Sequence, residues 1–188
     1  GTESGLDDVL KVMKKDHDLA QAYQAIDRLH EAGLIYDAHI MTGVAGKGRG
    51  MENAEALAQF LNRTNPAHVV NFSMFLHKEV PLYQDIRQGT FVPADELETI
   101  REEYHLIERI APEKVGANIL YDGFHDFIHV RVRGHLPGDK EKMLAKLNGI
   151  IQEYEGKEPV YSFVQGECAD LEYCDDGKAV WDMDRKTS

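Results

Sequence analysis

The chain has 188 residues, enough for one hydrophobic core with an appendage, and its apolar fraction of 43% excludes a disordered protein. A formal charge of −12 disfavours loose binding to nucleic acid, although a small anionic ligand would need only a local group of donors. The sequence has no run of about 20 apolar residues and no basic-then-apolar signal segment, so we expect a cytoplasmic protein without membrane contact.

The first five residues, GTESG, read as the last step of a β-strand and the turn after it, and an amphipathic helix over 6–15 follows directly. We therefore expect the chain to open in the middle of a folding unit. Asp18 is placed to cap a second helix, which Gly33 ends. The further elements predicted before Pro112 are a strand over 34–41, a helix over 52–62, a strand over 68–74, a short helix over 81–88 and a long helix over 95–110.

This alternation of helices and strands predicts an α/β fold in which right-handed crossovers build a parallel sheet. In such folds the site lies at the carboxyl ends of the strands. Those ends are expected at 1–5, 43–50 and 75–81.

The pattern changes after Pro112. The predicted elements there are strands over 117–121 and 127–133 with a turn between them, a helix over 138–154 and a last strand over 159–164. We therefore predict an α/β unit over 1–112, an α+β extension over 113–165 and an acidic, flexible tail over 166–188. The only cysteines, Cys168 and Cys174, fall in that tail, and two thiols in a chain without an export signal do not predict a disulfide scaffold.

Two features at the expected strand ends are candidates for ligand binding. Glu3 could accept hydrogen bonds from a ligand's hydroxyl or ammonium groups, or it could serve only as an acid at a helix start. The loop GVAGKGRG over 43–50 could bring backbone N–H groups to an anion, or it could be a mobile surface loop with two cations. It matches neither the Walker phosphate loop nor the dinucleotide fingerprint.

Polar residues also alternate along the two central strands. Asp37 and His39 share one side of their strand, and they would touch a ligand if that side faces a barrel interior or mark a solvated edge if it does not. Asn71 and Ser73 share a side as well, either as satisfied core groups or as ligand contacts. Nine histidines are present, but metal-binding spacings such as His-Glu-x-x-His and paired Cys-x-x-Cys are absent, so we predict no metal site made by protein ligands alone.

Three segments together resemble a known family. Residues 1–15, GTESGLDDVLKVMKK, are similar to the "G-x-E-S-G-x-x-x-V-L-x-x-M-x-K" stretch of radical S-adenosylmethionine (radical SAM) enzymes, in the subgroup with methylthiotransferases, the Elongator catalytic subunit and oxygen-independent coproporphyrinogen oxidase. Residues 29–46 resemble that subgroup's "aGi…imlGlpGe" segment. Asn65-Pro66, the Pro81-Leu82-Tyr83 run and Gly89 resemble its "P…v…(g)TPLy…G" segment. The similarity covers residues 1–110.

The resemblance implies that this chain is half of a (β/α)6 TIM-type barrel with an α+β extension behind it. The parent enzyme would hold a [4Fe–4S] cluster on three cysteines of a CxxxCxxC loop. The cluster would reduce S-adenosylmethionine to methionine and a 5′-deoxyadenosyl radical, which abstracts hydrogen from a substrate. The motif CxxxCxxC is absent from the 188 residues, so we expect the chain to be the second half of a longer enzyme and to be inactive alone.

The resemblance also implies site residues. The positions that would contact S-adenosylmethionine are Glu3, Met41, Gly43, Gly46, Asn71 and Ser73. The chain departs from the family at Gly46, where many members have an acid or a Pro-Gly pair, and at Val80, where a Gly-Thr pair is usual. Residues 133–144 are similar to an "RGxLPxDKExML" stretch that follows the barrel in some members. Such a segment could pack across the open side of the barrel and shape the substrate pocket. The candidate substrate contacts are then His39, His125, Asp126 and His129, although the last three could instead have a structural role.

A half barrel would expose a sheet edge and apolar surface, so we predict that two copies pair through that seam. Two other functions stay open. One is an α/β barrel enzyme whose glycine loop binds a phosphorylated ligand through Lys47 and Arg49. The other is a non-catalytic α/β binding module.

Overall fold

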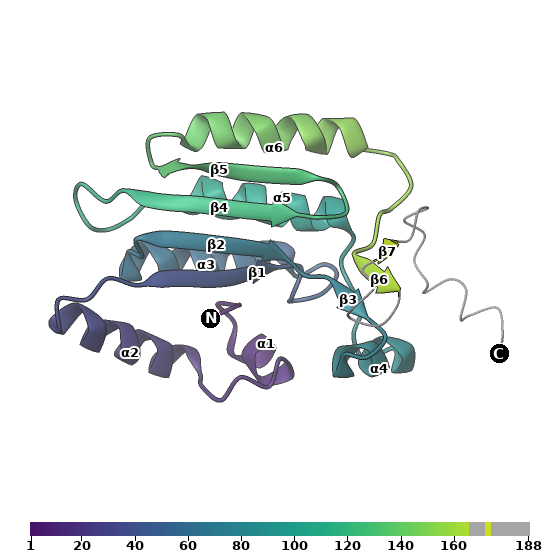
Figure 1. Cartoon of the computed structure of the whole chain (residues 1–188), viewed down its shortest axis with the longest axis horizontal. Helices are drawn as coiled ribbons and strands as arrows, with labels where there is room; N and C mark the ends of the chain where they lie inside the picture. The colour runs from purple at the N-terminus through teal and green to yellow at the C-terminus, as the bar shows by residue number, and fades with distance from the viewer. Residues whose placement is uncertain (166–171, 174–188) are drawn as a thin grey trace.

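A four-stranded open sheet forms the centre of the protein in a computed structural model that describes residues 1–165 and 172–173 (Figure 1). The strand order is β1-β2-β4-β5. Strands β1 (Asp37–Thr42), β2 (His68–Ser73) and β4 (Ile119–His125) are parallel, and β5 (Val130–Leu136) is antiparallel to β4. The predicted mixed α/β architecture is confirmed, and the described strands leave the sheet open at β1 and β5 rather than closing it into a barrel.

Helices cover one face of this sheet (Figure 1). The six helices of the described residues are α1 (Asp7–Val12), α2 (Leu19–Glu31), α3 (Gly50–Thr64), α4 (Pro81–Gln88), α5 (Glu96–Arg109) and α6 (Lys140–Tyr154). Helices α3 and α5 lie side by side behind the sheet, and α6 packs against α5 and β5. The main hydrophobic core includes Ile40, Leu57 and Ile100, and all three are completely buried.

Local sequence explains where the helices begin. The Asp18 carboxylate accepts a hydrogen bond from the Gln21 N–H at 2.8 Å, and the Asp18 N–H donates to the Gln21 side chain at 3.0 Å, which together form the capping box of α2. Asp95 accepts from the Glu98 N–H at 2.8 Å and caps α5 through this one bond. The predicted cap at Asp18 and the predicted bounds of α4 are both confirmed.

The start of the chain lies along the free edge of β1. Glu3 forms an isolated parallel bridge with Ile40: its N–H donates to the carbonyl of His39 at 3.1 Å, and its carbonyl accepts from Met41 at 2.9 Å. The first residues therefore do read as the end of a strand, followed by a turn and α1. Glu3 itself has a φ of 63°, a left-handed conformation that is uncommon outside glycine.

One expectation about the second half of the chain was wrong, the position of the turn between its first two strands. Residues 122–125 of the predicted turn lie inside β4, and the hairpin turn occupies 126–129 instead. Gly123, which suggested a turn, is needed in the strand because a side chain there would meet the carboxylate of Glu103 at 1.8 Å. The main sheet includes strands from both sides of residue 112, because β4 pairs with β2 in register.

A small second sheet lies beyond the carboxyl ends of β1 and β2 (Figure 1). Its strands are β3 (Leu76–His77), β6 (Phe163–Gln165) and β7 (Glu172–Tyr173), in the order β3-β6-β7. A satellite core with Val44, Met74 and Tyr83 joins this region to the loops at the strand ends. Most of the predicted tail over 166–188 lies outside the described residues.

Candidate site at the carboxyl ends of the strands

The face of the sheet opposite the helices carries an aromatic row. His39 of β1 meets Phe72 of β2 edge-on with ring centroids 6.5 Å apart. Phe72 stacks on Phe124 of β4 at 5.7 Å, and the guanidinium of Arg131 on β5 lies 4.7 Å from the centre of the Phe124 ring. Phe72 is 41% exposed, so this row offers a planar apolar surface toward solvent.

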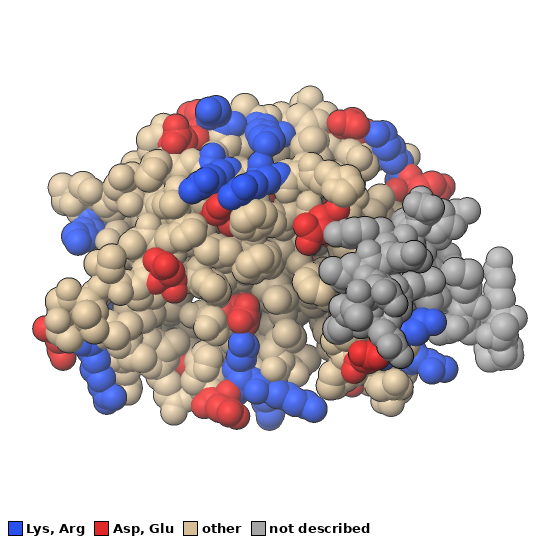
Figure 2. All heavy atoms as spheres, viewed as in Figure 1, with Lys and Arg blue, Asp and Glu red and all other residues tan. Residues whose placement is uncertain are grey.

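Charge is unevenly distributed over the same face. In Figure 2, Lys and Arg side chains gather over β5 and α6, while the middle of the face is largely uncharged. Asp122 of β4 pairs with this group, accepting from Arg131 at 2.9 and 2.7 Å in a bidentate arrangement. The hydrogen bonds from Arg131 hold the pKa of Asp122 below its usual value despite partial burial.

The glycine loop over 43–50 is packed rather than loose. Gly43 and Gly46 have φ values of 80° and 84°, which side-chain-bearing residues rarely adopt. A Cβ on Gly46 would lie 2.9 Å from the carbonyl of Val92, and the N–H of Lys47 donates to that same carbonyl at 2.8 Å. Arg49 at the end of the loop is held by the carboxylates of Asp8 at 2.7 Å and Glu52 at 2.8 Å.

Glu3 and Met41 lie close to this loop. The Glu3 carboxylate forms an ion pair with Lys15 at 2.9 Å, and its side chain is 17% exposed. Met41 is half-buried and directly follows Ile40, the residue that forms the bridge with Glu3. Its partner on β2 in the sheet register is Phe72. The structure therefore brings Glu3, Met41, Gly43 and Gly46 to one edge of the sheet.

Three buried carboxylates on α5 lie directly behind that edge. Glu96, Glu102 and Glu103 are each at most 1% exposed. Glu102 accepts from the Gly43 N–H at 2.8 Å and from the Asn53 side chain at 2.7 Å. Burial raises the pKa of Glu102 to about 8, because desolvation outweighs these two hydrogen bonds.

The other two carboxylates enclose His125. Glu103 accepts from Asn71 at 3.0 Å and from the Tyr121 hydroxyl at 2.9 Å, and its second oxygen lies 3.0 Å from Nε2 of His125. Glu96 lies 3.2 Å from Nδ1 of the same ring. Burial disfavours the charged imidazole, but the two carboxylates outweigh it and raise the pKa of His125 to about 10. His125 is therefore an imidazolium at neutral pH.

This arrangement locates the remaining predicted site residues. The side chains of Asn71 and Ser73 point toward α5, where Ser73 donates to Glu96 at 2.8 Å, so they do not share the aromatic face with His39. His125 is buried behind the sheet. Asp126 and His129 are exposed in the β4–β5 turn at the carboxyl edge. Whether any of these residues contacts a ligand stays a prediction.

Sequence reasoning missed the acids of α5. Their signal is the helical spacing itself, since Glu96 and Glu103 fall on the same inward stripe as Ile100 and Ile107. Acids on an apolar stripe must be paired or protonated when the helix packs. The bounds of α5 could be predicted from its cap and its apolar residues alone. The buried acids were therefore not needed for that prediction and were overlooked.

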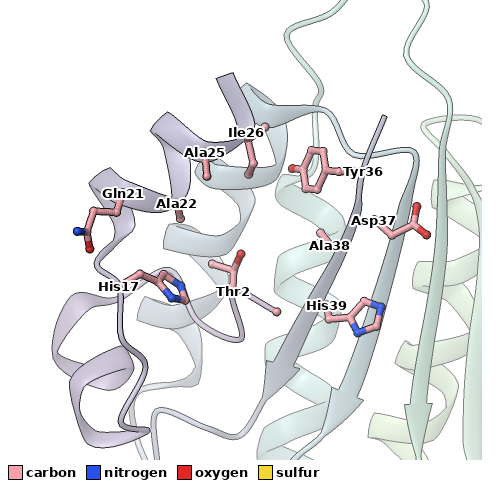
Figure 3. A pocket seen from close by; sticks show the side chains of 11 residues that line it. Thr2, His17, Gln21, Ala22, Ala25, Ile26, Tyr36, Asp37, Ala38 and His39 are labelled. Carbon is pink, nitrogen blue, oxygen red and sulfur yellow. The ribbon is translucent and has the colours of Figure 1, made fainter. Parts of the chain in front are cut away.

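A hollow of about 260 Å³ lies between α2 and the start of β1 (Figure 3). Ala22, Ala25 and Ile26 of α2 form its apolar wall, and in the figure His17 points toward Thr2 across it.

Among the described residues no group of three or more His, Cys, Asp or Glu could hold a metal ion. No helix in this part of the chain is long and apolar enough to cross a bilayer.

The comparisons with known proteins give one informative result. No protein-family model and no curated protein matches the chain. A solved structure does match, titled "The archaeal Methanocaldococcus infernus Elp3 with N-terminus deletion (1-46)", with a TM-score of 0.57 and 18% sequence identity. The match covers 82% of this chain and 35% of that one, so the chain spans about a third of its length. At this identity the likeness shows a shared fold.

Proposed function

We propose that this chain is the S-adenosylmethionine-binding part of a radical SAM enzyme. The observation that carries the proposal is the placement of the two most family-like segments: the GTESG turn bridges to β1, and the glycine loop follows that same strand. The fold shared with Elp3, a radical SAM superfamily member, supports this assignment independently of the sequence motifs. The parent's hydrogen-abstraction chemistry and the inactivity of this chain alone belong to the proposal.

The residues at the sheet edge fit one end of such a cofactor. Glu3 would accept from the ammonium or ribose hydroxyls, and Gly43 and Gly46 would let the backbone approach the adenosyl group. Met41 would line the same space. When bound, S-adenosylmethionine supplies the 5′-deoxyadenosyl group in enzymes of this kind.

A [4Fe–4S] cluster does not fit this chain. Such a cluster needs three cysteine ligands in the expected motif. The sequence has only Cys168 and Cys174, and both lie outside the described residues. We therefore assign no residue of this chain to the cluster and propose that its ligands belong to another part of the parent.

Ligand-dependent thermal stability tests the proposal. At a concentration ten times its Kd, S-adenosylmethionine would stabilise the chain by about 1.4 kcal/mol, or roughly 3–6 °C in Tm. Glu3→Gln should reduce that shift, and Glu31→Gln, on the exposed surface of α2, should leave it unchanged. Stabilisation by inorganic phosphate but not by S-adenosylmethionine would favour the phosphate-binding alternative, and stabilisation by neither would favour a non-catalytic module.

We also propose that two copies associate at the free edge of β1. In the described residues that edge pairs only through the Glu3–Ile40 bridge, and unpaired strand edges readily recruit another chain. Sedimentation velocity over a concentration series should detect the dimer, and a monomer throughout would refute the association.

A further inference from the structure

The glycine loop over 43–50 has two features of an anion-binding loop, backbone N–H groups at glycines and a helix that starts at its end. That helix is α3, and its N-cap residue, Arg49, makes no side-chain capping bond. A phosphorylated ligand would use these N–H groups together with the cations of the loop. Whether the loop can take such a ligand depends on which of these donors are still available in the folded chain.

Two acids of α5 accept hydrogen bonds from the backbone of this loop. The Gly43 N–H donates to Glu102 at 2.8 Å, and the Gly48 N–H donates to Glu98. Glu98 and Glu102 are four residues apart on α5, so both side chains lie on the same side of the helix. One helix therefore supplies carboxyl oxygens to both ends of the loop.

The remaining donors of the loop are also engaged or enclosed. Three more of its N–H groups donate to backbone carbonyls at 2.8–3.2 Å, those of Gly46, Lys47 and Arg49. Val44 and Ala45, between the glycines, are at most 8% exposed. The Arg49 guanidinium binds the carboxylates of Asp8 at 2.7 Å and Glu52 at 2.8 Å. A phosphate group would have to displace contacts that the protein already makes.

The carboxyl group of Glu102 also occupies the N-terminal end of α3. A Cβ on Gly50, the first residue of that helix, would lie 3.0 Å from Oε2 of Glu102. Oε1 accepts from the Asn53 side chain at 2.7 Å, and Glu102 is fully buried. An anionic ligand would bind at this end of the helix if it were free. The position is blocked by where the two oxygens lie, whether or not the carboxyl group carries a proton.

We propose that Glu98 and Glu102 determine which ligands the glycine loop admits. They fill its anion-binding position from within the protein and exclude a phosphate group, so the ligand at this edge of the sheet is unphosphorylated. This inference rests on the proposed function, because it concerns the ligand of the same site, and it adds the residues that select against phosphate.

Titration with inorganic phosphate at constant ionic strength, followed by NMR at the backbone amides of Gly43 and Gly48, tests this selection. Neither signal should shift in the wild-type chain. Glu98→Ala removes the acceptor of the Gly48 N–H, which is exposed beside Lys47. Phosphate should then shift the Gly48 signal and bind at least about tenfold more tightly, the gain from one charge-assisted hydrogen bond. Glu108→Ala, the same change at an exposed position of α5, should behave as the wild type does.

A saturating shift of either signal in the wild-type chain, or no gain in Glu98→Ala, would overturn the proposal. Glu102→Ala extends the test to the buried position, where formate matches the deleted carboxyl group. Formate should raise the Tm of this variant and not that of the wild type, and the absence of this rescue in the folded variant would overturn the role of Glu102. The phosphate titration alone decides if Glu102→Ala fails to fold. It contains no S-adenosylmethionine, so a failure of S-adenosylmethionine binding is recognised separately.

Discussion

Replacing His125 by glutamine should destabilise the protein strongly. The imidazolium lies 3.0 Å from Glu103 and 3.2 Å from Glu96, and all three side chains are inaccessible to solvent. Glutamine keeps a polar group at the site but removes the positive charge and one of the two donors. The variant would leave two neighbouring carboxylates without a cation in the interior of the protein.

The size of the effect follows from that geometry. Removing one partner of a buried ion pair costs about 3–5 kcal/mol, because the remaining charge stays desolvated. The cost also depends on pH. The pKa of His125, about 10 in the folded protein, lies above its ordinary value of 6.5. Its contribution is therefore complete below pH 6.5 and is lost as the pH rises through 10.

Urea unfolding at pH 6.5 and at pH 9.5 measures this contribution. We expect the wild-type chain to exceed His125→Gln by about 3–5 kcal/mol at the lower pH and by less at the higher pH. His129→Gln, which changes an exposed histidine four residues away, should stay within about 0.5 kcal/mol of the wild type. A loss below about 1 kcal/mol, or a difference that does not change with pH, would refute the positive charge assigned to His125.

Four further substitutions are tested by the same unfolding assay. Gly123→Ala should cost about 1–3 kcal/mol because its methyl group would meet Glu103, whereas Gly149→Ala, at an open position of α6, should stabilise by roughly 0.5–1 kcal/mol; the reverse order would contradict the packing. Asp18→Ala should cost about 1 kcal/mol through the lost cap of α2, and no change would mean that the capping box is not formed. The lowered pKa of Asp122 gives a contribution that is present above pH 3.8 and lost as the pH falls further, so Asp122→Asn should reduce the acid sensitivity of unfolding, and an unchanged acid limb would count against it.

The sequence predicted helix bounds and caps correctly where they depend on residues only a few positions apart. The bounds of α4 and the cap at Asp18 depend on proline, glycine and capping chemistry within a few residues, and both were confirmed. The turn between β4 and β5 was predicted at the wrong place because Gly123 was taken as a turn residue. Gly123 instead leaves room in the strand for the carboxylate of Glu103, twenty residues away in the sequence. Local reading cannot find such a contact, since its reason lies in another element.

The residues of the candidate site also differ in whether their placement could be predicted from the sequence. Residues at the strand ends, such as Glu3 and Gly43, could be selected because topology alone brings strand ends together. Asn71 was also selected, but alternation gives only the side on which a residue lies, not which side faces the helices. That side became known only once α5 was seen to present Glu103 to it.

Two glycines seat neighbouring carboxylates of α5. A Cβ on Gly50 would approach Glu102 to 3.0 Å, just as one on Gly123 would collide with Glu103. Each glycine therefore leaves the space that the facing carboxylate occupies. A larger residue in place of the glycine would need a change of the acid as well. Among homologues, positions 50 and 102 should covary, as should positions 123 and 103, with a larger residue appearing in place of glycine only where the facing acid has been shortened or lost.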